Sequence, residues 1–174
     1  MTPDDRIAQW KLHNSQRGWF GRALYIAMAQ DERIVLLTGD LGYGIFDAHK
    51  EDFPDRYYNV GAAEQVLLGA ACGMAIDHKL IPFCYSITPF LVYRPMEWLR
   101  NYLHHENIPV KLVGAGMNDD YKHDGFTHHA FEAKKVMRCL PNIVPFYPHD
   151  MAIIPSMVRT MCSNNRPCFM GLRR

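Results

Sequence analysis

Glu64 is the residue of this sequence whose surroundings suit its type least. It falls in the segment GAAEQVLLGAACGMAID, residues 61–77, which is small and apolar almost all round and predicts a buried helix. A glutamate is almost never fully buried unless it is paired. In such a place its carboxyl could share a proton with a ligand nitrogen. Spacing alone equally allows a structural role, in which Glu64 caps the helix or meets a salt-bridge partner.

A second candidate region is the segment GAGMNDDYKHDGFTHHA, residues 114–130, which is long and rich in Gly, Asp and His. Long loops in compact domains are usually functional. A lone histidine is usually structural, but a Thr-His-His run in a glycine-rich loop is less typical of that role, which singles out His128. No pair among these histidines is set on a predicted helix at i, i+4, so we expect no metal site in this chain.

Alternating helical and short apolar segments hold these residues in place. Apolar runs predict strands at residues 34–39, 80–86, 109–116, 142–148 and 166–173. Apolar periodicity predicts helices at residues 17–30, 61–77, 94–106 and 131–140. Asp150 is typical of a helix N-cap and predicts a further helix that runs to about Cys162.

Strands that alternate with helices indicate βαβ units, and therefore an α/β fold with a mainly parallel sheet and helices on both faces. In such sheets ligands bind beyond the carboxyl ends of the strands. Those ends carry Asp40, residues 86–93 and residues 114–129. We expect one domain at residues 17–174, preceded by an N-terminal extension at residues 1–16.

Composition excludes several functional classes. The 174 residues carry a formal net charge of +1, without the basic run or stripe that nucleic-acid and acidic-membrane binders have. No stretch approaches the roughly 18 uncharged apolar residues of a membrane helix, and the N-terminus lacks the apolar core of a signal peptide. The five cysteines show no CxxC spacing and indicate reduced, partly buried thiols in a cytoplasmic protein.

Four segments together resemble the pyrimidine-binding domain of transketolase-type thiamine-diphosphate (ThDP) enzymes. NVGAAEQ resembles the segment that carries the cofactor-activating glutamate, and GDLG at 39–42 resembles the turn after the first strand. DGFTHH resembles the family motif D-G-P-T-H-x, and PCFMGLRR resembles the closing strand. The similarity spans residues 14–174 in the family order and spacing, and is closest to the C-terminal section of a split transketolase.

The resemblance assigns cofactor-binding roles to four residues. Glu64 matches the glutamate that hydrogen-bonds the aminopyrimidine of the cofactor and activates it. Phe90 matches the aromatic that stacks on this ring, and Tyr93 matches a second pocket aromatic, although their spacing alone also suits an ordinary core. Asp40 matches an acidic residue close to the cofactor, and a solvated turn aspartate is the equal alternative.

The resemblance also assigns substrate contacts. His128 matches the catalytic histidine that reaches a sugar hydroxyl near the reacting carbon, and Asp124 matches the acid that reads a neighbouring hydroxyl. Arg17 and Arg174 match arginines that bind the substrate phosphate, a role that suits a guanidinium fork, and surface arginines are the alternative.

Several residues depart from the family pattern, and the departures put a standard pentose-phosphate substrate in doubt. Gly116 stands where a histidine is common and Gly44 where a serine is common. Phe126 replaces the motif proline, and Ile87 replaces an aromatic.

A diphosphate-binding domain with its GDG and Asn-Asn motifs is missing from the sequence. GDL at 39–41 is not GDG, and Asn164-Asn165 lies too far along the chain. We therefore expect the cofactor to lie between two polypeptides. A GDG…NN subunit would hold the diphosphate through Mg²⁺, and the family expectation is a heterotetramer with two copies of each chain (α₂β₂).

The resemblance favours transfer of a two-carbon ketol unit between sugars or sugar phosphates by such a split enzyme. The alternative enzyme is the beta-type subunit of a ThDP-dependent 2-oxo acid decarboxylating enzyme, or one like deoxyxylulose-phosphate synthase. The alternative of another class is a non-catalytic pyrimidine-domain module that scaffolds a partner.

Overall fold

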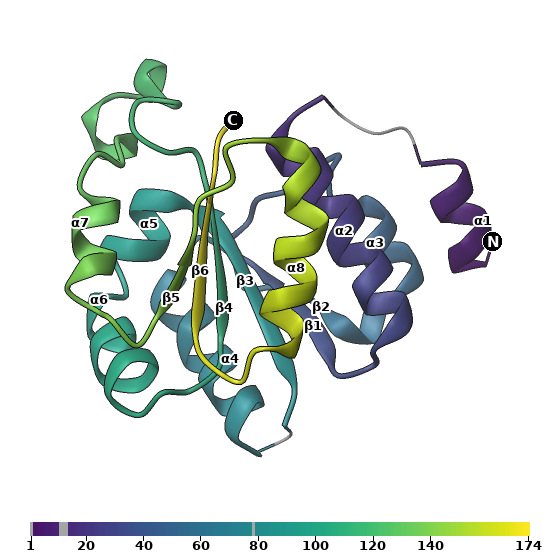
Figure 1. The fold of residues 1–174 in the computed structure, drawn as a ribbon, viewed down its shortest axis with the longest axis horizontal. Coiled ribbons are helices and arrows are strands. Elements are labelled where there is room, and N and C mark those ends of the chain that lie inside the picture. The colour runs from purple at the N-terminus through teal and green to yellow at the C-terminus, as the bar shows by residue number, and fades with distance from the viewer. Residues whose placement is uncertain (1, 11–13, 78) are drawn as a thin grey trace.

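The computed structural model describes residues 2–10, 14–77 and 79–174 of the chain (Figure 1). Its helices are α1 Pro3–Ala8, α2 Gln16–Gln30, α3 Asp47–Asp52, α4 Glu64–Asp77, α5 Thr88–Tyr93, α6 Met96–Trp98, a π-helix Leu99–His105, α7 Ala133–Arg138 and α8 Ile154–Ser163. Short 3₁₀ turns are Pro54–Arg56, Lys122–Asp124, Phe126–His128 and Met151–Ile153. The strands are β1 Ile34–Thr38, β2 Tyr57–Asn59, β3 Ile81–Ile87, β4 Lys111–Ala115, β5 Val144–Phe146 and β6 Cys168–Leu172.

All the strands of the sheet pair in parallel, in the order β2-β1-β3-β4-β6-β5. The α/β class with helices on both faces is confirmed, and the sheet has six strands where about five were predicted. Because parallel strands share a direction, their carboxyl ends meet at one edge of the sheet. The C-terminus marks this edge at the top of Figure 1.

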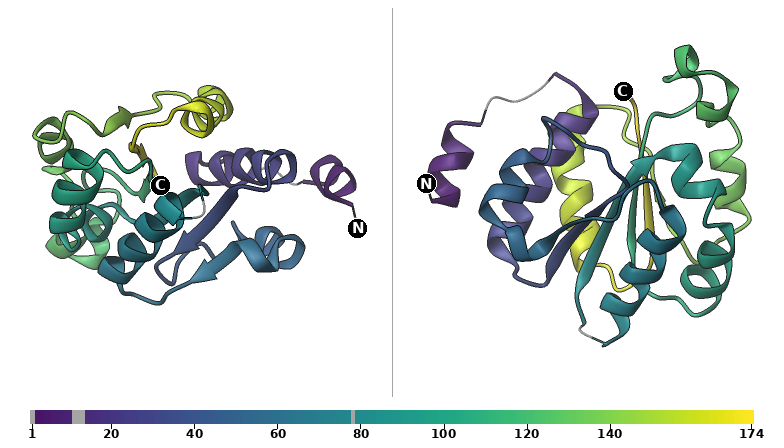
Figure 2. Two further views of the ribbon diagram at one scale, coloured as in Figure 1. Left: turned by 90° about the horizontal axis from the view of Figure 1, so that it is seen from below. Right: turned by 180° about the vertical axis from the view of Figure 1, so that it is seen from behind.

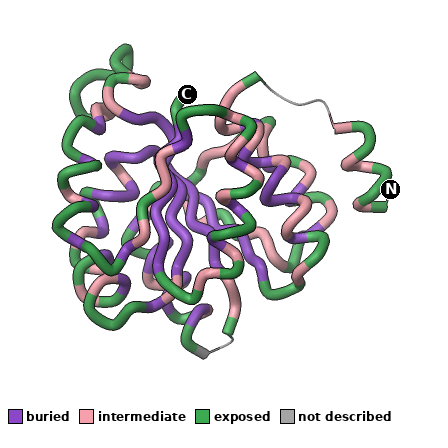
Figure 3. The backbone as a smooth tube through the Cα atoms, in the orientation of Figure 1, coloured by how far each residue is buried: buried purple, intermediate pink, exposed green. Residues whose placement is uncertain are grey.

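Alternate strand residues enter two separate hydrophobic clusters, one on each face of the sheet. Val35 and Leu37 of β1 pack with α4, α5 and α7, whereas Ile34 and Leu36 pack with α2 and α8. The views from below and behind show the sheet between these helical layers (Figure 2). The strands β1, β3, β4 and β6 form the buried centre of the molecule (Figure 3). Two covered faces explain why the central strands read as continuous apolar runs.

Several predicted elements differ from the structure in extent. The five predicted strands are each present but shorter or shifted by a residue or two, and the predicted helix at 131–140 is reduced to α7. The predicted helix at 94–106 is present over residues 96–105, where α6 continues directly into the π-helix. Pro95 separates it from α5, because a proline ring is incompatible with a continuous helix interior.

The helix α4 corrects the prediction in two ways. It begins at Glu64 itself, so the glutamate is the first helical residue rather than one turn inside. It is also not buried all round, because Val66 is 59% and Ile76 57% exposed. The predicted cap of the last helix is confirmed, since Asp150 accepts a hydrogen bond from the Ala152 N–H at 3.0 Å.

The N-terminal part contains α1 and the start of α2. Ser15 caps α2 by accepting a hydrogen bond from the Gly18 N–H, and the helix begins at Gln16, one residue before the expected domain boundary at 17. Of the expected extension, residues 1 and 11–13 lie outside the described part of the chain. Within the described part, no helix is both long and apolar enough to cross a membrane.

Candidate functional site

Glu64 is the most deeply buried carboxylate at the carboxyl edge of the sheet. The residue is 2% exposed, and each oxygen of its side chain has a partner. Ser86, near the end of β3, donates its hydroxyl to Oε1 at 2.8 Å. Arg94, directly after α5, donates Nη1 to Oε2 at 2.8 Å in an ion pair. The salt-bridge partner that the sequence left open therefore exists in the structure.

Phe90 and Tyr93 lie on α5, which starts directly after β3. Neither residue belongs to either hydrophobic cluster, so the alternative that both are ordinary core residues is not supported. The Arg94 guanidinium lies over the Phe90 ring, 3.7 Å from its centroid, and the His128 ring meets the same ring edge-on at 4.8 Å. Glu64, Arg94, Phe90 and His128 thus form one continuous group.

Tyr93 faces a different neighbourhood from Phe90. Its hydroxyl lies 3.4 Å from the Glu132 carboxylate. Burial, and after it Glu132, raises the pKa of Tyr93 to about 12, so the phenol stays protonated at neutral pH. With Phe126 and Phe131 it lines a cavity of about 390 Å³. Tyr93 therefore lines a cavity beside the Glu64 group and is not a member of that group.

Asp40 follows β1 in a left-handed conformation, with φ of 58°. Asn59, at the end of β2, and Tyr43 each donate a hydrogen bond to its Oδ1, at 3.0 and 2.7 Å. These bonds, the one from Asn59 first, lower the pKa of Asp40. The exposed carboxylate is therefore held in a fixed direction at the edge of the sheet, which a freely solvated turn aspartate would not be.

Arg17 and Arg174 come from opposite ends of the chain and meet at Tyr121. Arg17 Nη1 donates to the Tyr121 hydroxyl at 3.1 Å, and the Arg174 guanidinium lies 5.0 Å from the centre of the Tyr121 ring. Arg174 Nη1 also lies 3.0 Å from His123 Nε2. Among the described residues, neither guanidinium has an acidic salt-bridge partner.

Asp124 does not join His128 directly, although the two were assigned to adjacent substrate hydroxyls. Its carboxylate lies 3.2 Å from His123 Nε2, which connects it to the arginine group instead. His128 Nδ1 is 3.1 Å from the Thr127 hydroxyl. Apart from Tyr93, the predicted site residues therefore lie in three groups along one edge of the sheet. These are the Glu64 group, the Asp40 group (Asp40 with Asn59 and Tyr43) and the arginine group (Arg17, Arg174 and Asp124 with Tyr121 and His123).

Gly116 and Gly44, which both depart from the family pattern, differ in how much space surrounds them. A Cβ at Gly116 would lie 2.3 Å from the Tyr121 ring, and the glycine has a φ of +77°. A histidine could therefore not stand at 116 beside Tyr121 in this arrangement, because the ring fills its space. Around Gly44 there is no neighbour within 4 Å of a built Cβ, so a serine would be tolerated sterically.

Sequence reasoning missed the residues that link the predicted ones, namely Ser86, Arg94, Asn59 and Tyr121. Arg94 could have been predicted as the partner of Glu64, because a buried glutamate requires a partner and Arg94 is next to the predicted pocket aromatics in the sequence. Tyr121 could not have been predicted, since its neighbours Arg17 and Arg174 are far away in the sequence.

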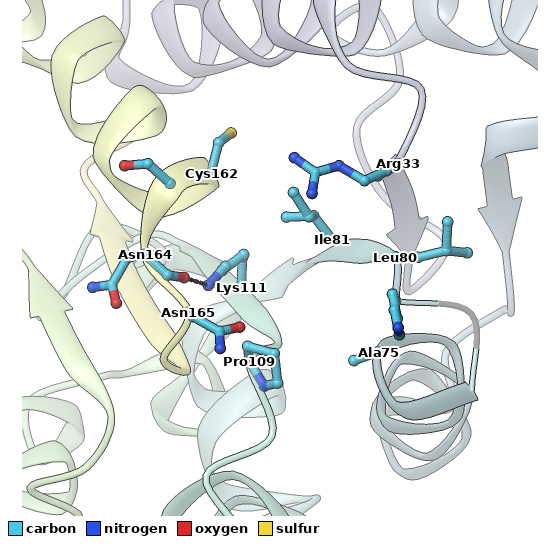
Figure 4. A pocket seen from close by; sticks show the side chains of 11 residues that line it. Arg33, Ala75, Leu80, Ile81, Pro109, Lys111, Cys162, Asn164 and Asn165 are labelled. Carbon is cyan, nitrogen blue, oxygen red and sulfur yellow. Dashed lines mark hydrogen bonds between the residues drawn. The ribbon is translucent and has the colours of Figure 1, made fainter.

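A cavity of about 470 Å³ lies at the opposite, amino edge of the sheet (Figure 4). Its buried Lys111 donates to the carbonyl groups of Asn164 and Arg166, at 2.5 and 2.6 Å. Desolvation lowers the pKa of this lysine. These carbonyl groups directly follow the C-terminal end of α8, where a cation is stabilising, so this cavity has a structural explanation.

Comparisons with known proteins identify the family of this chain. The family model for the transketolase pyrimidine-binding domain matches residues 15–174. A putative transketolase C-terminal section from Methanocaldococcus jannaschii is 29% identical over 94% of this chain and 52% of its own length. A 1-deoxy-D-xylulose-5-phosphate synthase from Aquifex aeolicus is 32% identical over 85% of this chain and 23% of its own.

A solved structure, described as a split gene transketolase in an inactive beta4 tetramer, is 30% identical with a TM-score of 0.80. The match covers 92% of this chain and 51% of that one, so the chain spans about half the length of these split relatives. Since the family model covers nearly all the described residues, the chain belongs to the family of transketolase pyrimidine-binding domains.

Proposed function

We propose that this chain is the pyrimidine-binding part of a ThDP-dependent, transketolase-like transferase that moves a two-carbon ketol unit between sugars. One observation carries the proposal. The buried carboxylate of Glu64 and the ring of Phe90 together hold a planar N–H donor, here the Arg94 guanidinium, at the carboxyl edge of the sheet. An aminopyrimidine that carries a proton on its ring nitrogen is a planar donor of the same kind.

The residues present fit the cofactor. Glu64 would hold a proton between its carboxyl and the pyrimidine ring nitrogen, Phe90 would stack on the ring, and Asp40 would lie near it. ThDP would supply the electron sink that makes cleavage beside a carbonyl possible. Ser86 fixes Oε1 of Glu64, so the carboxyl presents its other oxygen to the pocket in a defined direction.

The substrate would extend from the Glu64 group toward the arginine group. His128, against the edge of Phe90, would contact the hydroxyl near the reacting carbon. Asp124 would read a hydroxyl further along. Arg17 and Arg174, which lack an acidic salt-bridge partner among the described residues, would hold a distal anionic group such as a phosphate.

A second polypeptide of the GDG…NN type would complete the enzyme and hold the diphosphate through Mg²⁺, in an α₂β₂ assembly. Exposed apolar side chains around the site support such a partner. Tyr43 is 77%, Val66 59%, Phe126 83% and Phe131 53% exposed. Apolar residues gathered beside a binding site are typical of a protein interface. We propose a cytoplasmic location for the assembly, in line with its unpaired cysteines.

The second candidate is acyl chemistry on a 2-oxo acid, as in deoxyxylulose-phosphate synthases, and the similarity to one such enzyme favours it. A combined binding and activity experiment tests both. ThDP–Mg²⁺ is titrated calorimetrically into the isolated chain and into its complex with a GDG…NN polypeptide, and the complex is then supplied with ketose donors or with pyruvate.

We expect weak ThDP binding by the isolated chain, tight binding by the complex, and turnover of a ketose donor. Turnover of pyruvate alone would favour the second candidate. Failure of the complex to bind ThDP would leave the scaffolding module, and tight binding with turnover by the lone chain would contradict the shared site.

A further inference from the structure

Arg94 occupies both of the contacts that the proposed function reserves for the cofactor ring. Its Nη1 lies 2.8 Å from Glu64 Oε2, and its guanidinium carbon lies 3.7 Å from the centroid of the Phe90 ring. The Arg94 side chain is 46% exposed, whereas that of Glu64 is 1% exposed. The arginine therefore covers the carboxylate from the solvent side.

We propose that Arg94 is an internal stand-in for the aminopyrimidine, which fills the cofactor-ring position in the free chain and leaves Glu64 when the cofactor enters. This inference rests on the proposed function and concerns how the same site is regulated. It assigns to Arg94 a role at the site beyond that of a structural ion pair.

The surroundings of Glu64 allow a ligand to approach from one side. On the strand side, the buried Ser86 hydroxyl donates to Oε1. Gly39 also lies close to Oε1, since a Cβ built on it would be 3.4 Å from this oxygen. Oε2 is the oxygen that faces the half-exposed Arg94. A ring nitrogen that bonds to Glu64 must therefore take the place of the arginine.

The contacts of Phe90 lead to the same conclusion. Arg94 covers the face of the ring at a stacking distance, and His128 lies against it at 4.8 Å with the planes inclined by 68°. A flat ring that stacks on the face beside Glu64 would overlap the guanidinium. The two contacts are thus exchanged together, which makes binding a competition between Arg94 and the cofactor.

In such a competition, only the chains in which Arg94 has left Glu64 can bind the cofactor. The apparent affinity for the cofactor is therefore reduced in proportion to that fraction of chains. Removing the arginine should therefore strengthen cofactor binding. A part-exposed ion pair and a cation–π contact are each modest, so their combined loss should tighten binding about tenfold, which corresponds to about 1.4 kcal/mol.

The test uses the complex with the GDG…NN polypeptide and the probe ThDP with Mg²⁺, titrated calorimetrically. We expect Arg94→Met to lower the Kd about tenfold, and Arg94→Gln, which keeps an N–H donor, to lower it less. Arg100→Gln, an exposed arginine on the following π-helix, is the matched control and should leave the Kd unchanged. An unchanged or higher Kd in Arg94→Met would overturn the inference.

A second measurement needs no cofactor. In the isolated chain, a double-mutant cycle of Glu64→Gln and Arg94→Met by urea unfolding should show a clear coupling, because the residues are in contact. Additive effects would overturn the inference even if the complex binds ThDP. Conversely, a complex that binds no ThDP with either Arg94 or Met at 94 would refute the proposed function itself, and the stand-in role with it.

Discussion

Glu64→Gln separates the catalytic and the structural roles of this residue. Glutamine keeps the shape of the side chain and can still meet Ser86 and Arg94, which now lie 2.8 Å from the two carboxylate oxygens. It removes the carboxyl group that would share a proton with the cofactor. The substitution therefore changes one chemical property in a largely conserved geometry.

The effect on stability follows from the two hydrogen bonds. Bonds to a charged group contribute about 1.5–3 kcal/mol and neutral ones about 0.5–1.5 kcal/mol. Relief of the buried charge offsets part of this difference. The exposure of Arg94 weakens its share further. We therefore expect the free energy of unfolding to fall by only about 1 kcal/mol.

The effect on cofactor activation should be much larger. General acid–base catalysis by a positioned group is worth about 10²–10⁴-fold. The assay is exchange of the thiazolium proton of ThDP with deuterated water in the assembled complex, followed by NMR after rapid acid quench. We expect exchange to slow by at least 10²-fold. Glu97→Gln, the same substitution at an exposed carboxylate, is the control and should leave exchange unchanged.

Near-normal exchange in Glu64→Gln would refute the reasoning. If it were accompanied by a stability loss well above 1 kcal/mol, Glu64 would be a structural ion-pair residue held by Arg94, and the resemblance would not extend to its catalytic role.

Three further predictions address other residues. Phe90→Ala should weaken ThDP binding by about 0.5–1.5 kcal/mol by calorimetry, whereas a large fall in Tm with unchanged affinity would make Phe90 a core residue. His128→Ala should lower turnover of a sugar donor and leave ThDP affinity nearly intact, and loss of cofactor binding would place His128 in the cofactor pocket instead. Burial lowers the pKa of His49 from 6.5 to about 3, so the unfolded state binds more protons between these values. Stability is then full above pH 6.5 and should decline as the pH falls toward 3, by up to about 1.4 kcal/mol per pH unit. His49→Leu should reduce this slope in urea titrations, and an unchanged slope would contradict the assignment.

The central strands could be predicted because burial on both faces leaves a continuous apolar run, as in β1 and β3. The strand β2 could not, since its residues Tyr57–Asn59 form no apolar run, whereas the equally short edge strand β5 lies within the apolar run at 142–148. The prediction that α4 is buried on all sides was wrong for a related reason. Val66 and Ile76 are apolar but exposed, and a sequence does not separate a core face from a face open to a partner.

The site was predictable residue by residue but not as a set of contacts. Glu64 and Phe90 could be named from motifs, whereas the pairing of Glu64 with Arg94 joins positions 30 residues apart. Glu64 follows β2 and Arg94 follows β3 and α5, so the pairing depends on where these strands lie in the sheet. The same holds for Tyr121, which meets Arg17 over a separation of 104 residues.

A structure of the assembled complex with ThDP and Mg²⁺ bound would test the central claim most directly, through the position of one ring. The account predicts the aminopyrimidine stacked on Phe90, its ring nitrogen within hydrogen-bond distance of a Glu64 oxygen, and Arg94 displaced from that oxygen. An aminopyrimidine bound elsewhere, with Arg94 still paired to Glu64, would contradict it.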